Sequence, residues 1–249
     1  MSFSKIIIFN LLLLYSFNSF SHNPEDLVIA EIEQGQMTFE NEQITKEYNA
    51  ALKRLRMRRI EAMSFQKKFL IFTKSGFNHI IPKGLDHILF VLGLFFSFLS
   101  FRSLLFQVTA FTMAHSITLV LAGIGWIELQ STIIEPLIAL SIVWIAIENC
   151  IFKKPNKWRF LLIFIFGLIH GMGFATVLSH YGIPKDNFLS SLLAFNIGVE
   201  IGQLSILMMA FILTRLILKK NWQNKQVKIS VSIIIGLIGL FWFIERLLN

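Results

Sequence analysis

The sequence predicts an all-α fold, a polytopic membrane helix bundle with about six transmembrane helices. Of the 249 residues, 55% are hydrophobic and only 15% are charged, whereas soluble domains carry about a quarter charged residues. Phenylalanine alone occupies 26 positions, which is more apolar surface than a water-soluble core of this length can bury. The composition excludes a soluble enzyme and a disordered chain, and the single cysteine, Cys150, excludes a disulfide scaffold.

Residues 1–21 have the pattern of a cleaved secretory signal peptide. Lys5 precedes an apolar run over residues 6–17, and Ser19 and Ser21 are small residues at the positions that a signal peptidase reads. The alternative is an uncleaved first helix, which would leave the following segment on the same outer side of the membrane.

Residues 22–75 form a polar segment that we expect on the outer, periplasmic side. Between Glu42 and Phe72 apolar residues recur at mostly three- and four-residue steps, which predicts an amphipathic helix. This helix either lies on the outer membrane face or leads into the first spanning helix, and residues 76–249 are expected to form the transmembrane bundle. The segment is too short to form an independent catalytic domain.

Six apolar stretches of near-spanning length follow, at residues 85–101, 103–124, 132–152, 158–179, 187–217 and 229–248. From residue 85 onward, the loops assigned to the inner side contain ten lysines and arginines, and the outer side contains two. This bias predicts a multi-pass protein of the bacterial inner membrane with its mature N-terminus in the periplasm. It also explains the net charge of +8 without a nucleic-acid partner.

Ionisable side chains lie within these apolar stretches, where each costs about 2.5 to 3.5 kcal/mol on insertion scales. His115 and His170 fall near the middle of the second and fourth stretches. Asp86 and His87 open the first stretch, shortly after His79. In the fifth stretch, polar side chains share one helical face because of their spacing. These are Asn196, Glu200 and Gln203.

Neutral histidines with carboxylates are the ligand set of a borderline divalent cation such as Ni²⁺, Co²⁺ or Zn²⁺. The predicted metal ligands are His79, Asp86, His87, His115, His170 and Glu200, and the residues predicted to orient them are Ser116, Asn196 and Gln203. The alternative is a hydrogen-bond network between helices that holds no metal. For Glu148, near the inner end of the third stretch, an ion pair with an inner basic residue and a ligand role at the exit are both open.

Five ordered motifs resemble the HupE/UreJ family of membrane proteins. They are Gly84-Leu-Asp-His-Ile-Leu-Phe90, Thr109-Ala-Phe-Thr-Met-Ala-His-Ser-Ile-Thr-Leu119, Glu135-Pro-Leu-Ile-Ala-Leu-Ser-Ile142, Phe166-Gly-Leu-Ile-His-Gly-Met-Gly-Phe174 and Phe195-Asn-Ile-Gly-Val-Glu-Ile-Gly-Gln203. The resemblance implies an association with hydrogenase and urease accessory genes and a role as a nickel or cobalt permease. One departure is that the His-Pro pair of the hydrogenase-linked branch is replaced here by His79-Ile-Ile-Pro82.

The sequence therefore predicts a membrane transporter for a divalent transition metal, with membrane lipid and the metal ion as its partners and self-association as an open option. No Walker motif supports ATP-driven pumping by this chain alone. A rival interpretation is an intramembrane zinc-dependent hydrolase, similar to a lipid amidase, that uses Asp86, His87, His115, Ser116 and His170. A third is an accessory or scaffold protein without transport.

Overall fold

The computed structural model describes residues 42–97, 100–127, 130–152, 158–181, 188–218 and 224–248, and among these it forms helices and no strand. The helices are α3 (Glu42–Ala62), α4 (Phe65–Ile80), α5 (Leu85–Phe95), α6 (Phe101–Gly123), α7 (Ser131–Ile151), α8 (Arg159–Tyr181), α9 (Phe188–Leu218) and α10 (Lys225–Leu248). The predicted all-helical class is therefore confirmed. The predicted signal peptide lies outside the described residues.

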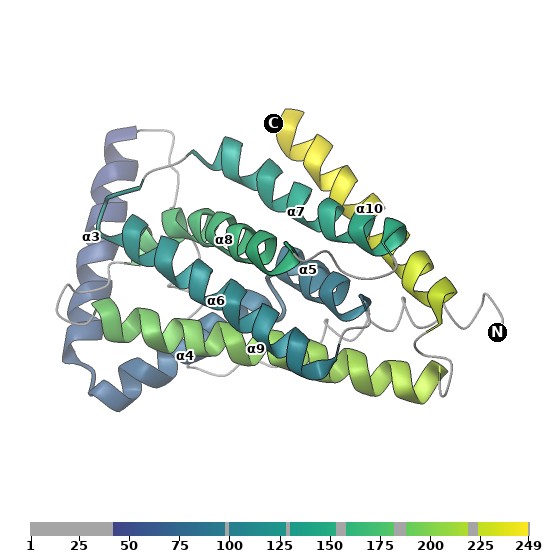
Figure 1. Cartoon of the computed structure of the whole chain (residues 1–249). Coiled ribbons are helices and arrows are strands. Elements are labelled where there is room, and N and C mark those ends of the chain that lie inside the picture. Colours follow the sequence, from purple (N-terminus) through teal and green to yellow (C-terminus); the bar gives the residue numbers. More distant parts are fainter. Residues whose placement is uncertain are drawn as a thin grey trace.

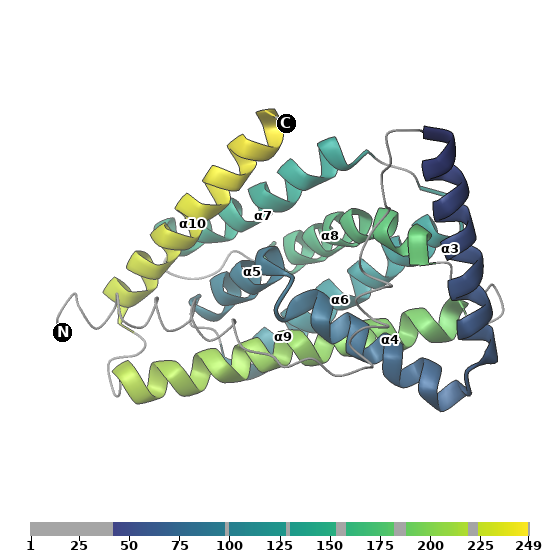
Figure 2. The same ribbon diagram turned by 180° about the vertical axis from the view of Figure 1, so that it is seen from behind.

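The bundle is built from closely packed helix pairs, α6 with α8, α7 with α10 and α4 with α9 (Figure 1). Seen from behind, the short helix α5 lies in the middle of the bundle, between α7 and α9 (Figure 2). Helix α3 stands across one end of the bundle at a steep angle to the other helices (Figure 1). Its residue Ile60 packs there against Phe72 of α4 and Ala194 of α9.

The six predicted stretches coincide in position with α5 to α10. Among the described residues, four helices are long and apolar enough to cross a membrane, namely α6, α7, α9 and α10. Helix α5 has 11 residues and is about 16 Å long, which is shorter than a hydrocarbon core of about 30 Å, so this helix would not cross the core by itself. The count of six spans stays a prediction.

The predicted amphipathic helix is divided in the structure. Helix α3 ends at Ala62, and Ser64 then caps α4 by accepting a hydrogen bond from the Lys67 backbone amide. Helix α4 continues past residue 75, where we placed the start of the bundle, and packs along α9. A Cβ atom on Gly76 would meet the Phe195 carbonyl, and one on Gly198 would meet the Thr73 carbonyl. These glycines bring the two backbones together.

A turn over residues 81–84 separates α4 from α5, so this part of the chain is a broken helical element. Gly84 lies so close to the His79 carbonyl that a side chain would not fit there. Eight of the 11 residues of α5 are buried, and the Asn149 side chain of α7 donates to the Gly93 carbonyl at 2.8 Å. The broken element therefore places the end of α4 and the start of α5 inside the bundle.

Two ion pairs mark the two ends of the bundle. At the Arg159 end, where α6 and α8 begin and α7 finishes, Arg159 contacts Glu148. At the Arg246 end, where α5 and α7 begin and α10 finishes, Arg246 contacts Asp86. The helix ends that the sequence assigns to the inner side thus meet at the Arg159 end.

Candidate metal centre

Four histidines from four helices converge inside the bundle: His79 at the end of α4, His87 at the start of α5, His115 in α6 and His170 in α8. The ring centroids of His87 lie 4.9 Å from those of both His79 and His170, and 5.8 Å from that of His115. One nitrogen from each of His79, His87 and His115 can be chosen so that all three lie within 4.8 Å of one another. We call these four residues the histidine cluster.

Three residues of the histidine cluster are buried, His79 is half-buried, and the cluster offers ring nitrogens that could bind a ligand. His87, His115 and His170 are at most 6% exposed. Within the described part of the chain, buried ring nitrogens of His79 (Nε2), His87 (Nε2) and His170 (Nδ1) lack a hydrogen-bond partner, and His115 interacts with the Asn196 side chain through no more than one of its two nitrogens. Since buried polar atoms are normally hydrogen-bonded, this concentration of unpaired nitrogens points to a ligand-binding role.

Ser141 of α7 contacts the ring of His170 and holds its orientation. The Ser141 hydroxyl donates its proton to the Ile138 carbonyl at 2.6 Å and lies 3.0 Å from Nε2 of His170. With its proton directed to the carbonyl, the hydroxyl accepts from the tautomer of His170 that is protonated at Nε2. The lone pair of Nδ1 is then available, as expected for a histidine oriented to bind a metal.

Glycines of α8 allow the close approach of α6 that the cluster needs. A Cβ atom on Gly171 would lie 2.5 Å from the His115 carbonyl oxygen, and one on Gly167 would lie 2.5 Å from the Phe111 carbonyl oxygen. Small residues permit such contacts between membrane helices. His115 and His170 therefore lie on two backbones that touch.

Aromatic rings enclose the histidine cluster. Phe174 of α8 and Phe195 of α9 stack at 4.8 Å and lie 4.3 and 5.6 Å from the His79 ring. Phe111 lies 5.0 Å from His170 and 5.8 Å from His87. This apolar surround excludes water, which strengthens any interaction between the imidazoles and a cation.

Comparison with known proteins gives one family match: residues 55–246 match the HupE / UreJ protein family. The chain belongs to the HupE/UreJ family. This confirms the resemblance drawn from the five motifs. No curated protein and no solved structure matches the chain. Membership associates the chain with nickel and cobalt handling, by uptake or in accessory roles, and the apolar helices agree with a membrane protein.

Three of the four histidines, His87, His115 and His170, lie within the family motifs. His79 precedes the first motif. Asp86, the neighbour of His87, does not join the cluster. Both of its carboxylate oxygens accept hydrogen bonds from Arg246 at 3.1 Å, and Arg246 also donates to the Glu135 carbonyl. A ligand role for Asp86 requires this ion pair to open.

The remaining predicted residues lie mainly between α6 and α9. Glu200 accepts a hydrogen bond from Thr109 at 2.6 Å, and Gln203 accepts one from Thr112 at 2.8 Å. Ser116 donates to a carbonyl of its own helix. Asn196 lies beside His115, and the two side chains are placed to share a hydrogen bond. Of this group, Asn196 is best placed to orient a ligand.

Sequence reasoning did not assign roles to Ser141 or Arg246. The structure buries the Ser141 hydroxyl completely. In the sequence, the signal that could have identified it is a polar residue in the middle of a predicted span. Arg246 was counted as an outer-side charge, and nothing in the sequence indicates that it reaches α5, 160 positions earlier in the chain.

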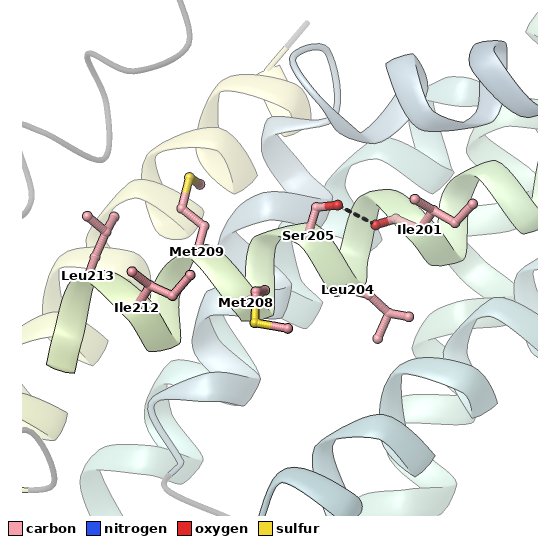
Figure 3. Close-up of a pocket in the computed structure, with 7 residues that line it drawn as sticks. All are labelled: Ile201, Leu204, Ser205, Met208, Met209, Ile212 and Leu213. Carbon is pink, nitrogen blue, oxygen red and sulfur yellow. Dashed lines mark hydrogen bonds between the residues drawn. The ribbon is translucent and has the colours of Figure 1, made fainter. Parts of the chain in front are cut away.

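Helix α9 has polar groups on its cluster side and an apolar depression elsewhere. The depression is lined by Ile201, Leu204, Ser205, Met208, Met209, Ile212 and Leu213 (Figure 3). Ser205 is its one hydroxyl, and it donates to the Ile201 carbonyl of the same helix at 2.8 Å. Apolar, exposed side chains such as Met208 make this a lipid-facing surface.

Proposed function

We propose that this HupE/UreJ protein is a permease that carries a divalent transition metal, nickel or cobalt, across the membrane by way of the histidine cluster. The observation that carries the proposal is the convergence of His79, His87, His115 and His170 with unpaired nitrogens inside an apolar bundle. Intramembrane ionisable groups are rare and mark ion pathways.

The ligand chemistry agrees with the proposed cargo. Imidazole nitrogens suit borderline cations such as Ni²⁺ and Co²⁺, whereas Mg²⁺ and Ca²⁺ prefer oxygen. The neutral form of an imidazole is the form that binds metal. Three nitrogens within 4.8 Å of one another are close to the spacing of ligands around one ion, so small side-chain rotations would complete a site.

The hydrolase interpretation has less support. It needs Asp86 and Ser116 close to the metal, but Asp86 is held by Arg246 and the Ser116 hydroxyl donates to the Thr112 carbonyl at 2.7 Å. The histidine cluster is assembled without either group.

The test is Ni²⁺ binding and Ni²⁺ uptake by the purified full-length protein in liposomes, comparing wild type with His87→Ala and His115→Ala. We expect both variants to lose binding and uptake together while the amount of folded protein is unchanged. The matched control is Ser205→Ala, which removes a polar group from the lipid-facing side of α9 and should leave both measurements as in wild type. Normal uptake by His115→Ala would overturn the proposal.

A further inference from the structure

A second buried polar group lies in line with the histidine cluster, towards the Arg159 end. Glu148 follows Ser141 by seven residues of α7, and Arg159 precedes His170 by 11 residues of α8. By helical geometry each lies within about 20° of the corresponding residue at the cluster, and about 10 and 16 Å further along the helix axis. The pair therefore occupies the same interior stripe of the bundle.

Glu148 and Arg159 are sealed from solvent. Their side chains are 4% and 3% exposed, and the Arg159 guanidinium donates to Glu148 at 2.5 Å and to the Gln107 side chain of α6 at 3.1 Å. Lys228 of α10 also faces this end and donates to the Phe152 carbonyl. Three helices that hold the histidine cluster and its serine, α6, α7 and α8, are thus tied together by one arginine.

An aromatic layer separates this ion pair from the histidine cluster. Phe111 lies one helical turn from both Gln107 and His115 on α6. Its ring is 5.0 Å from that of Phe90, and Phe90 is 6.0 Å from Phe166. Phe90 and Phe111 are almost completely buried. A cation at the cluster therefore meets an apolar layer and then a fixed positive charge on the way to the Arg159 end.

We propose that Glu148 and Arg159 form the gate that closes the Arg159 end of the cation path, with Phe90, Phe111 and Phe166 as its apolar layer. The proposal rests on the proposed transport function. Movement of α8 away from α7 and α5 would part the two charges and separate Phe166 from Phe90. The pair at the other end differs, because Asp86 and Arg246 are 25% and 21% exposed.

A buried ion pair is costly to form and adds little stability compared with apolar residues. Its presence at a closed point of a predicted ion path is therefore better explained by gating than by stability. A gate made from opposite charges also predicts that exchanging the two charges preserves closure.

The experiment measures access to the space between the cluster and the ion pair. Ile145 is 1% exposed and lies on α7 between Ser141 and Glu148, so Ile145→Cys in a Cys150→Ser background supplies a reporter thiol. A charged, water-soluble thiol reagent is applied to the full-length protein. We expect slow labelling with the intact pair and about tenfold faster labelling when Glu148→Gln and Arg159→Gln are combined. The double replacement removes both charges of the pair together, so neither partner is left buried without the other, and the variant should fold.

Two further variants complete the test. The exchanged pair, Glu148→Arg with Arg159→Glu, should restore slow labelling. Loss of the exposed pair on α3 through Glu42→Gln and Lys46→Gln should change nothing. Equal labelling with and without the Glu148–Arg159 pair would overturn the gate. A wild-type protein that binds no Ni²⁺ would instead overturn the proposed function, so the two failures are distinguishable.

Discussion

The contact between α6 and α8 predicts that a single methyl group at Gly171 disrupts the histidine cluster. In Gly171→Ala the new Cβ would lie 2.5 Å from the His115 carbonyl oxygen, 3.0 Å from the His115 Cα and also against the Thr118 hydroxyl. Two of these three atoms belong to the α6 backbone, which cannot rotate away as a side chain can. The helices must therefore separate at the position of His115.

The size of the separation follows from ordinary contact distances. Ordinary van der Waals contact of a Cβ atom begins at about 3.4 Å, and the distance to the His115 carbonyl oxygen would be 2.5 Å. Helix α6 must therefore move by about 0.9 Å relative to α8. Metal–ligand distances tolerate only about 0.2 Å, so a shift of this size between His115 and His170 should weaken Ni²⁺ binding by at least about tenfold. The same overpacking should lower the free energy of unfolding by about 1 to 3 kcal/mol.

The assay is titration of purified protein with Ni²⁺, together with thermal unfolding. Gly173→Ala is the matched control on the same helix, because its Cβ would meet only side-chain methyl groups, Ile138 Cδ1 at 2.8 Å and Ile134 Cγ2 at 3.6 Å, and a side-chain end can shift. We expect near wild-type affinity for Gly173→Ala and weakened binding for Gly171→Ala. Unchanged Ni²⁺ affinity in Gly171→Ala would refute the argument that this helix contact sets the spacing of the histidines.

Three other predictions follow from individual contacts. Ser141→Ala should weaken Ni²⁺ binding by about 10- to 100-fold without changing the number of ions bound, because the ring of His170 loses the oxygen that holds its orientation. Titration with Ni²⁺ measures this, and an unchanged affinity would contradict it. Arg246→Gln should lower the free energy of unfolding by no more than about 1 kcal/mol, since the pair with Asp86 is partly exposed; chemical denaturation measures this. Ser64→Ala should cost about 1 kcal/mol through loss of the α4 cap, with Ser205→Ala as the neutral comparison.

The sequence predicted the helices of the bundle well because membrane helices require long apolar stretches with few charges. It also identified His115 and His170, since an imidazole in the middle of such a stretch is conspicuous. It did not predict that α4 enters the bundle, because Lys67, Lys68 and Lys74 make this helix too polar to resemble a span. Only the packing of Gly76 and Gly198 between α4 and α9 reveals it.

One ion pair was anticipated in kind and the other was not. Glu148 was expected to pair with an inner basic residue or to bind metal, and the structure confirms the first alternative with Arg159. The sequence gives the depth of a residue in the membrane but not the direction of its side chain across the bundle. Asp86 was predicted as a metal ligand because it is an ionisable residue that opens the first apolar stretch, beside His87, and neighbouring residues on a helix point about 100° apart. That rotation turns the carboxylate towards Arg246.

The charges around the histidine cluster limit how tightly it would hold a metal ion, and so how readily the ion would be released. Four neutral imidazoles leave the two positive charges of a bound ion uncompensated, while the carboxylates of Asp86 and Glu148 are each engaged by an arginine and that of Glu200 accepts a hydrogen bond from Thr109. In an apolar interior an uncompensated charge is costly, so the metal would bind less tightly than at a site that includes thiolates or free carboxylates. Weak binding is a disadvantage for a structural or storage site, but a carrier must let go of its ion on the far side. The pairing of the carboxylates with Arg246 and Arg159 thus favours transport over permanent metal retention.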